Sequence, residues 1–137
     1  MSELIDLLKK HESMKLLPYT DTTGHLTIGV GRNLTDVGIS IDEAEYLLTN
    51  DVHHFQGELR RAFPWFSLQL AARQDAITDM AFNMGIVGLL KFKNTLKHIQ
   101  AEEYDLAATG MLESKWAGQV GERALRLSKM MRTGEYE

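Results

Sequence analysis

Residues 19–31 read YTDTTGHLTIGVG, and this stretch predicts a β-hairpin. The segment from Tyr19 to Asp21 has the composition of a short strand, and Thr22 to Gly24 that of a turn. His25 to Gly31 then forms the returning strand. The hairpin is the only β-structure that we expect in the chain.

The returning strand has one nearly bare face. Side chains alternate along a strand, so His25, Thr27, Gly29 and Gly31 share a face. Glycine weakens a strand, and a repeated pair is typical of a place where a ligand or another backbone comes close. A bulge or a bend explains the pair equally well, and both interpretations stay open.

The remaining sequence predicts helices, so the fold class is mainly α (α+β) with one small β-hairpin. A first helix begins at Ser2 and fades near His11 to Ser13. The capping box Ser40-Ile41-Asp42-Glu43 opens a long helix that reaches about Ala62, before Pro64. Apolar periodicity predicts further helices over 70–84, 89–100, 102–112 and 122–131.

Composition limits the classes of function. The 137 residues fit one domain, contain no cysteine and carry a net charge of −4, so neither disulfides nor a general affinity for nucleic acid is expected. No apolar run approaches the length of a membrane span. Residues 115–132 nevertheless hold five basic residues against one acidic residue, which indicates either a patch for an anionic polymer or a solvated helix face.

Common catalytic constellations are absent, and a carboxylate pair remains. His11-Glu12 lacks the second histidine of a zinc-protease motif, and adjacent His53 and His54 point apart on a helix, so no metal or cofactor is expected. Glu12 ends the first helix and Asp21 lies at the hairpin tip. Two carboxylates of this kind suit glycosidic hydrolysis, although chance pairs are common among nineteen acidic residues.

The order of these residues is more specific. Leu7-x4-Glu12, followed by Asp21 and the strand Thr27-Ile28-Gly29-Val30-Gly31, resembles the catalytic segment of the T-even phage lysozymes, glycoside hydrolase family 24. The resemblance continues through Asp42-Glu43-Ala44-Glu45, Phe82-Asn83-Met84-Gly85, Asn94-Thr95-Leu96, Ser114-Lys115-Trp116 and Arg132-Thr133-Gly134. It implies that Glu12, Asp21 and Thr27 are the catalytic residues.

The same resemblance implies the architecture and the binding residues. We expect a single lysozyme domain with a two-lobe fold: an N-terminal lobe over about 12–60, and a helical C-terminal lobe over about 61–137 that includes helix 1–11. Substrate is expected between the lobes. The implied substrate-binding residues are Gly31, Asn33, Phe82, Asn83, Thr95, Lys115, Gln119 and Arg123, and Arg123 resembles the arginine that pairs with the catalytic glutamate.

The resemblance implies a muramidase. By this resemblance, Glu12 is expected to donate a proton to the leaving oxygen of the β-1,4 bond between N-acetylmuramic acid and N-acetylglucosamine. Asp21 with Thr27 is expected to hold the attacking water, which would invert the anomeric carbon. A lytic transglycosylase and a non-catalytic cell-wall-binding protein are the alternatives. The short span from Gly31 to Asp42, with Arg32, Gly110 and Lys115 at sugar-facing or neighbouring positions, departs from the T-even pattern.

The implied substrate also predicts partners and location. Leu4 to Leu8 is interrupted by Asp6 and followed by lysines, so we see no signal peptide. We therefore expect a monomer made in the bacterial host cytoplasm, with no membrane insertion. It would reach the peptidoglycan of the cell wall once a holin has permeabilised the membrane.

Overall fold

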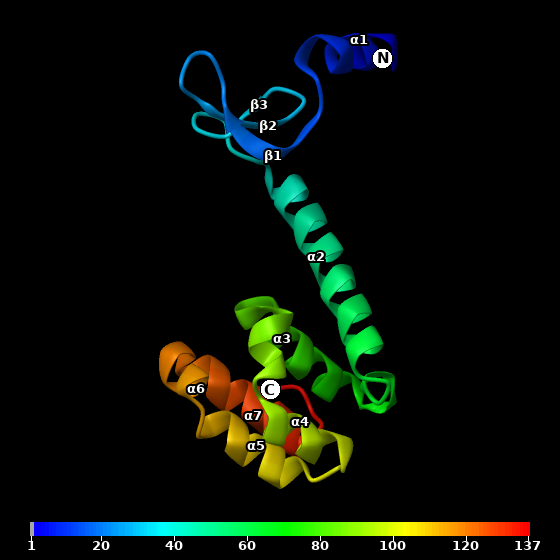
Figure 1. Ribbon diagram of the computed structural model, residues 1–137, viewed down its shortest axis with the longest axis vertical. Coiled ribbons are helices and arrows are strands. Elements are labelled where there is room, and N and C mark those ends of the chain that lie inside the picture. The colour runs from blue at the N-terminus through cyan, green and yellow to red at the C-terminus, as the bar shows by residue number, and fades with distance from the viewer. Residues whose placement is uncertain (1) are drawn as a thin grey trace. The chain divides into compact units, whose positions relative to one another are not determined.

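The computed structural model describes residues 2–137 and confirms the predicted mainly α class. It is 67% helical, with seven α-helices and one small three-stranded antiparallel sheet among these residues. The chain divides into two compact units, residues 1–47 and 48–137. The division falls inside α2, the helix Ile41–Ala62 (Figure 1).

The first unit contains α1 (Ser2–Glu12) and the sheet. Its strands are β1 (Lys15–Thr20), β2 (Leu26–Gly29) and β3 (Arg32–Asn33), in the order β1-β2-β3. The predicted hairpin is confirmed, although its returning strand covers Leu26–Gly29 and not His25 to Gly31. Its tip closes where Asp21 N donates to the His25 carbonyl at 2.9 Å. The sequence did not predict β3, because two residues are too short to show alternation.

The predicted capping box opens α2. The Glu43 N–H donates to Ser40 Oγ at 3.1 Å, and the Ser40 N–H donates to Glu43 Oε1 at 2.9 Å. Arg32 Nη1 also donates to Glu43 Oε1 at 2.7 Å, which ties β3 to the start of the helix. The Arg32 hydrogen bond, followed by that from the Ser40 N–H, lowers the pKa of Glu43 to about 2.

The second unit is helical throughout its regular structure. After the 3-10 turn Phe66–Leu68, its helices are α3 (Ala71–Leu90), α4 (Lys93–Gln100), α5 (Tyr104–Leu112), α6 (Lys115–Val120) and α7 (Glu122–Thr133). The helix predicted over 70–84 is interrupted just after its predicted end, at Gly85, where φ is 79° and ψ is 161°, but helix resumes and reaches Leu90. The predicted helix over 89–100 therefore begins only at Lys93, and α6 was not predicted.

A buried arginine organises the core of this unit. In Figure 1, α7 lies against α3 and α5, and α3 contributes Arg73. Its Nε donates to the Met131 carbonyl at 2.7 Å and its Nη2 to the Arg132 carbonyl at 3.0 Å. The guanidinium carbon lies 3.4 Å from the ring centroid of Tyr104. One cation thus satisfies carbonyls at the C-terminal end of α7 and stacks on α5.

Residues 2–137, which the structure describes, contain neither a candidate membrane span nor a candidate metal site. No helix there is both long enough and apolar enough to cross a lipid bilayer. No group of three or more His, Cys, Asp or Glu side chains there is close enough together to hold a metal ion.

Replacing Arg73 should destabilise the helical unit. Arg73→Met keeps the aliphatic stem but leaves the two α7 carbonyls without their donors, so we expect a loss of about 2–3 kcal/mol in the free energy of unfolding. Urea titration followed by circular dichroism measures it. Arg126→Met is the matched control, because Arg126 forms only an exposed 3.7 Å ion pair with Glu122, worth less than about 1 kcal/mol. Equal losses for the two variants would contradict this role.

Candidate functional site

The three predicted catalytic residues all lie in the unit of residues 1–47. Two of them form hydrogen bonds with the backbone of the same residue, His25. Asp21 Oδ1 accepts a hydrogen bond from the His25 N–H at 2.8 Å, and the Thr27 hydroxyl donates to the His25 carbonyl at 3.0 Å. The backbone of His25 therefore fixes Asp21 and Thr27 relative to each other.

Asp21 is held by its own turn. Besides the His25 N–H, its Oδ1 accepts from the Thr23 N–H at 2.9 Å and from the Thr23 hydroxyl at 2.8 Å. The His25 N–H is the largest influence on the carboxyl, followed by the Thr23 hydroxyl, and together these donors lower the pKa of Asp21. The side chain is therefore a carboxylate at neutral pH and can accept hydrogen bonds from a water molecule.

Thr27 lies in the middle of the sheet. It is the register partner of Tyr19 in β1 and of Asn33 in β3, and only 3% of its surface is exposed. Because its hydroxyl hydrogen goes to the His25 carbonyl, its oxygen offers lone pairs and no free hydrogen. Thr27 can therefore accept a hydrogen bond, as Asp21 can.

Glu12 is placed by a glycine. It is the last residue of α1, and Ser13 follows with a φ of 63°, which turns the chain toward β1. A Cβ atom built on Gly31 would lie 3.0 Å from Glu12 Oε2, so the carboxylate packs directly over the bare glycine. Both residues line a hollow of about 320 Å³ together with Ile5, Leu8, Lys9 and Val30.

Gly29 and Gly31, which the sequence predicts on one strand face, differ in the structure, because β2 ends at Gly29 and Gly31 lies in the turn before β3. Gly31 (φ 71°) was predicted to bind substrate, and its close neighbour in the structure is the Glu12 side chain. Gly29 (φ 69°) has no atom within 4 Å of the place where a Cβ would lie. Both glycines have a backbone conformation that other residues rarely adopt. Of the two, only Gly31 also has a side chain, that of Glu12, packed against it.

Asn33, the other predicted binding residue of this unit, is used within the fold. Its Oδ1 accepts from the Asp36 N–H at 3.0 Å, and its Nδ2 donates to Asp36 Oδ2 at 3.2 Å. These bonds close the turn that follows β3.

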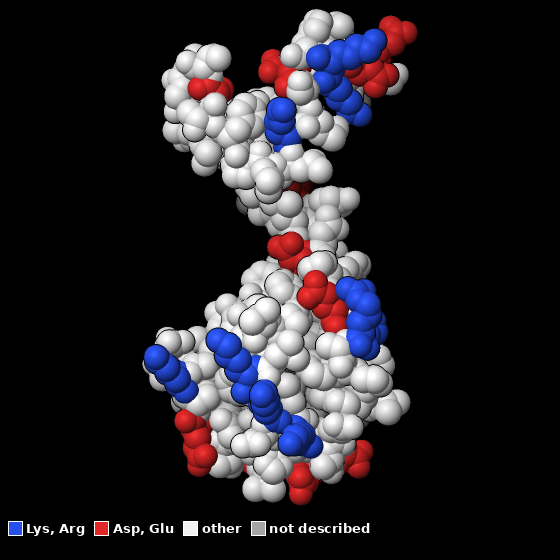
Figure 2. Space-filling view, viewed as in Figure 1, with Lys and Arg blue, Asp and Glu red and all other residues white. Residues whose placement is uncertain are grey.

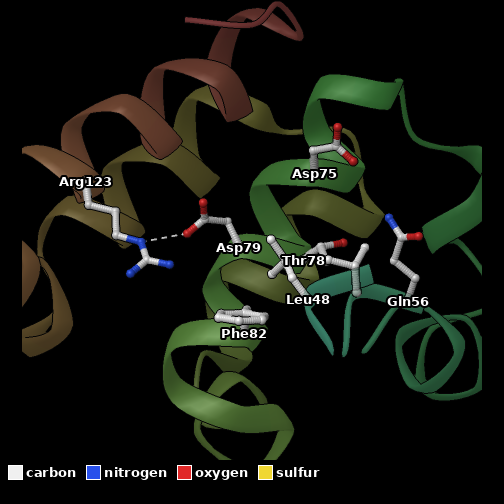
Figure 3. A pocket seen from close by; sticks show the side chains of 8 residues that line it. Leu48, Gln56, Asp75, Thr78, Asp79, Phe82 and Arg123 are labelled. Carbon is white, nitrogen blue, oxygen red and sulfur yellow. Dashed lines mark hydrogen bonds and ion pairs between the residues drawn. The ribbon is translucent and has the colours of Figure 1, made fainter. Parts of the chain in front are cut away.

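Phe82 and Arg123 line one hollow of the helical unit. It measures about 420 Å³, and its other lining residues are Leu48, Val52, Gln56, Asp75, Thr78 and Asp79 (Figure 3). Phe82 is 42% exposed, whereas Met80 on the same helix is buried. Arg123 Nε lies 2.7 Å from Asp79 Oδ1, so Asp79 is the ion-pair partner of this arginine in the structure.

The remaining predicted binding residues lie on α3, α4 and α6. Asn83 Oδ1 accepts from Trp116 Nε1 at 2.8 Å, and Trp116 is buried in the core of the helical unit. Thr95 is buried beneath Gly110, where an added Cβ would lie 2.6 Å from Thr95 Oγ1. Lys115 and Gln119 are exposed on α6.

The basic segment 115–132 is partly neutralised. Arg123 pairs with Asp79, Arg126 with Glu122, and Lys129 with Glu137. The surface of the helical unit as a whole carries both signs of charge, and Figure 2 shows lysine and arginine side chains in a band on one face with acidic side chains at its margin. Within segment 115–132, pairing of three of the five cations favours a solvated helix face over a strong site for an anionic polymer.

Sequence patterns missed three residues around Asp21. They are Thr23, His25 and Asp36, which are linked by hydrogen bonds between side chains. Asp21 is followed by Thr-Thr-Gly, and an aspartate before such residues is a signal for a turn in which the carboxylate accepts from the backbone N–H two residues on. That signal could have indicated Thr23, but no local pattern pointed to His25 or Asp36.

The chain is similar to known proteins over nearly its whole length. The chain is 26% identical over 162 residues to the pre-baseplate central spike protein Gp5 of Enterobacteria phage T4. This match covers 98% of the chain but only 28% of the spike protein. It is 28% and 29% identical to the probable T4-type lysozymes 2 and 1 of Dictyostelium discoideum, with 98% of the chain and 96% of each lysozyme covered. The phage lysozyme family model matches residues 9–132, and the chain therefore belongs to the phage lysozyme family.

Proposed function

We propose that the protein is a muramidase that hydrolyses the β-1,4 bond between N-acetylmuramic acid and N-acetylglucosamine in bacterial peptidoglycan. Membership of the phage lysozyme family supports glycoside hydrolase activity. The observation that carries the proposed mechanism is that Asp21 and Thr27 bond to the N–H and the carbonyl of one residue, His25, in the same unit as Glu12.

In this mechanism Glu12 is the general acid. It gives its proton to the glycosidic oxygen as the bond from that oxygen to the anomeric carbon breaks. The electron pair of the broken bond stays on the leaving oxygen, which becomes a hydroxyl group. The exposed position of Glu12 at the end of α1 allows it to regain a proton from solvent after each turnover.

Asp21 and Thr27 hold the water. A water molecule that donates its two hydrogens to two acceptors presents a lone pair to a third atom. The Asp21 carboxylate and the Thr27 oxygen are acceptors of this kind, and Asp21 takes the proton that the water loses when its oxygen bonds to the anomeric carbon. Attack from the face opposite the leaving group inverts that carbon.

The other residues and partners follow from the same proposal. The hollow lined by Phe82 and Arg123, and the second of about 420 Å³ lined by Thr95, Lys91 and Lys93, would hold sugar or peptide groups of the substrate. Because peptidoglycan lies outside the cytoplasmic membrane, a holin is the partner expected in a phage setting. The holin and the monomeric state stay predictions of the sequence.

Conservative replacement of either carboxylate should abolish turnover. Glu12→Gln cannot donate a proton, and Asp21→Asn cannot accept one, so we expect each variant to lose about 10²- to 10⁴-fold in kcat. Loss of turbidity of purified peptidoglycan measures the rate, and circular dichroism checks the fold. Asp6→Asn, an exposed acidic position on the same helix as Glu12, is the control and should match wild type. Substantial hydrolysis by Glu12→Gln would assign the acid to another residue.

The stereochemistry of the product tests whether a water molecule attacks the anomeric carbon directly. Inversion of a β-linkage gives the α-anomer first, and proton NMR of freshly formed reducing ends can detect it before the anomers equilibrate. An initial β-anomer would indicate retention and a covalent role for Asp21. A 1,6-anhydro end would establish the transglycosylase alternative.

Gly31→Ala should displace the acid. The new Cβ would press on the Glu12 carboxylate, so we expect at least a tenfold loss in kcat because small misplacements of a catalytic group are costly. Gly38→Ala is the matched control, since Gly38 has nearly the same φ, 68°, but nothing within 4 Å of the added atom. Both variants carry similar backbone strain, so equal activities would mean that the Gly31 contact does not position Glu12.

A further inference from the structure

A second layer of hydrogen bonds surrounds the Asp21 carboxylate. The Thr23 hydroxyl, which donates to Asp21 Oδ1 at 2.8 Å, also lies 2.6 Å from His25 Nδ1. On the other side of the ring, His25 Nε2 lies 3.1 Å from Asp36 Oδ2. The side chains therefore form a chain from Asp21 through Thr23 and His25 to Asp36.

The single hydrogen of the Thr23 hydroxyl decides how this chain is bonded. It can point to Asp21 or to His25 Nδ1, but not to both. When the His25 ring is protonated, its Nδ1–H donates to Thr23 Oγ1, and the hydroxyl hydrogen must go to Asp21. When the ring is neutral and keeps its hydrogen on Nε2, Nδ1 is a bare acceptor and competes with Asp21 for that hydrogen.

Asp36 selects between the neutral forms of the ring. A hydrogen on Nε2 can be donated to Asp36 Oδ2, whereas a bare Nε2 would place two acceptors 3.1 Å apart. Asn33 Nδ2 donates to the same oxygen at 3.2 Å and holds the carboxylate in place. Asp36 thus favours the neutral ring in which Nδ1 is free to accept from Thr23.

We propose that His25 is a positioning residue for Asp21, and that its protonation state, relayed by the Thr23 hydroxyl, sets the number of hydrogen bonds on the carboxylate that holds the water. The proposal rests on the proposed function, in which Asp21 accepts the proton of the water. With a protonated ring Asp21 Oδ1 has three donors, and with a neutral ring it keeps the two backbone donors.

The charges around the ring are few. Within residues 2–47, Asp21 at 3.8 Å and Asp36 at 3.1 Å are the titratable groups that form ion pairs with His25. The His25 and Asp21 side chains are each about one-third exposed, at 35% and 33%. The ring can therefore exchange protons with solvent while it remains bonded to the turn.

The path of hydrogen bonds from His25 through the Thr23 hydroxyl to Asp21, here called the relay, should affect the rate of hydrolysis. A carboxylate with fewer donors is the stronger base, so kcat should rise roughly two- to threefold as His25 loses its proton. Loss of the Thr23 donor should also raise the pKa of Asp21, because that hydroxyl is one of the groups that lower it.

NMR of the full chain tests the relay without reference to activity. The ring nitrogen resonances of His25 give its titration and should show the neutral form with hydrogen on Nε2. The carboxyl carbon of Asp21 should show its own titration and a second inflection at the midpoint of His25. In His25→Gln the second inflection should disappear. In Thr23→Val the pKa of Asp21 should rise by about half to one pH unit, and Thr23→Ser should restore it.

Control variants and kinetics complete the test. Thr22→Val and His53→Gln change exposed residues outside this chain of bonds and should leave both titrations as in wild type. In wild type the pH profile of kcat should carry the step at the midpoint of His25, and in His25→Gln it should not. In Thr23→Val the acid limb of the kcat profile should move to higher pH, because the pKa of Asp21 rises.

The two possible failures are distinguishable. If Asp21→Asn abolishes turnover but the Asp21 carbon ignores His25 and the Thr23 variants, the relay is overturned and the proposed function stands. In the second case the NMR signal of the Asp21 carboxyl carbon shows the His25 titration, but kcat changes with the titration of neither residue. The hydrogen bonds then exist but Asp21 does not hold the water. The proposed function fails, together with the inference built on it.

Discussion

One carboxylate oxygen, Asp21 Oδ1, accepts hydrogen bonds from the Thr23 N–H, the Thr23 hydroxyl and the His25 N–H. These bonds shape the tip of the β1–β2 hairpin and fix where the returning strand begins. The strand in turn places Thr27, whose hydroxyl is bonded to the carbonyl of the same His25. A residue to which we assign catalysis is therefore also the residue that folds its own turn.

This double use of Asp21 limits the chemistry of its two oxygens. Oδ1 is saturated by donors, which stabilise the charged form and lower the pKa. Hydrogen bonding to substrate or water is then the task of Oδ2. The donors that keep the carboxylate ionised also make it a weaker base. Loss of one of these hydrogen bonds would therefore make the Asp21 carboxylate a stronger base. His25 and Thr23 are placed to act in that way.

The sequence predicted what depends on local order. The capping box, the long helix to Ala62 and the hairpin around residues 22–24 are each encoded within a few residues, and all three are confirmed. Family resemblance named Glu12, Asp21 and Thr27, because they occur in a short motif. Long-range contacts were not predictable in this way: β3 depends on pairing with β2, and Arg73 reaches carbonyls 58 and 59 residues away.

A short helix and the hydrogen-bonded side chains around His25 were also not predicted, because no local sequence pattern encodes them. The six residues of α6 complete fewer than two turns, so apolar periodicity cannot reveal them, although Ser114 caps the helix by accepting from the Ala117 N–H. His25 shares a strand face with Thr27 in the pattern, but its bonds to Thr23 and Asp36 join the two ends of a folded turn. Only the structure brings Asp36, eleven residues farther along, to the ring.

Structure and chemistry at Asp21 can still be separated, because an amide resembles a carboxylate on one side only. The amide oxygen of an asparagine could accept the same three hydrogen bonds as Oδ1 and keep the hairpin tip folded. Its NH₂ group would replace Oδ2 with a donor, which cannot accept a hydrogen from water. Glutamine in place of Glu12 likewise keeps its shape over Gly31 but has no acidic proton to give. Loss of turnover with the turn intact would therefore reflect proton transfer and not the fold.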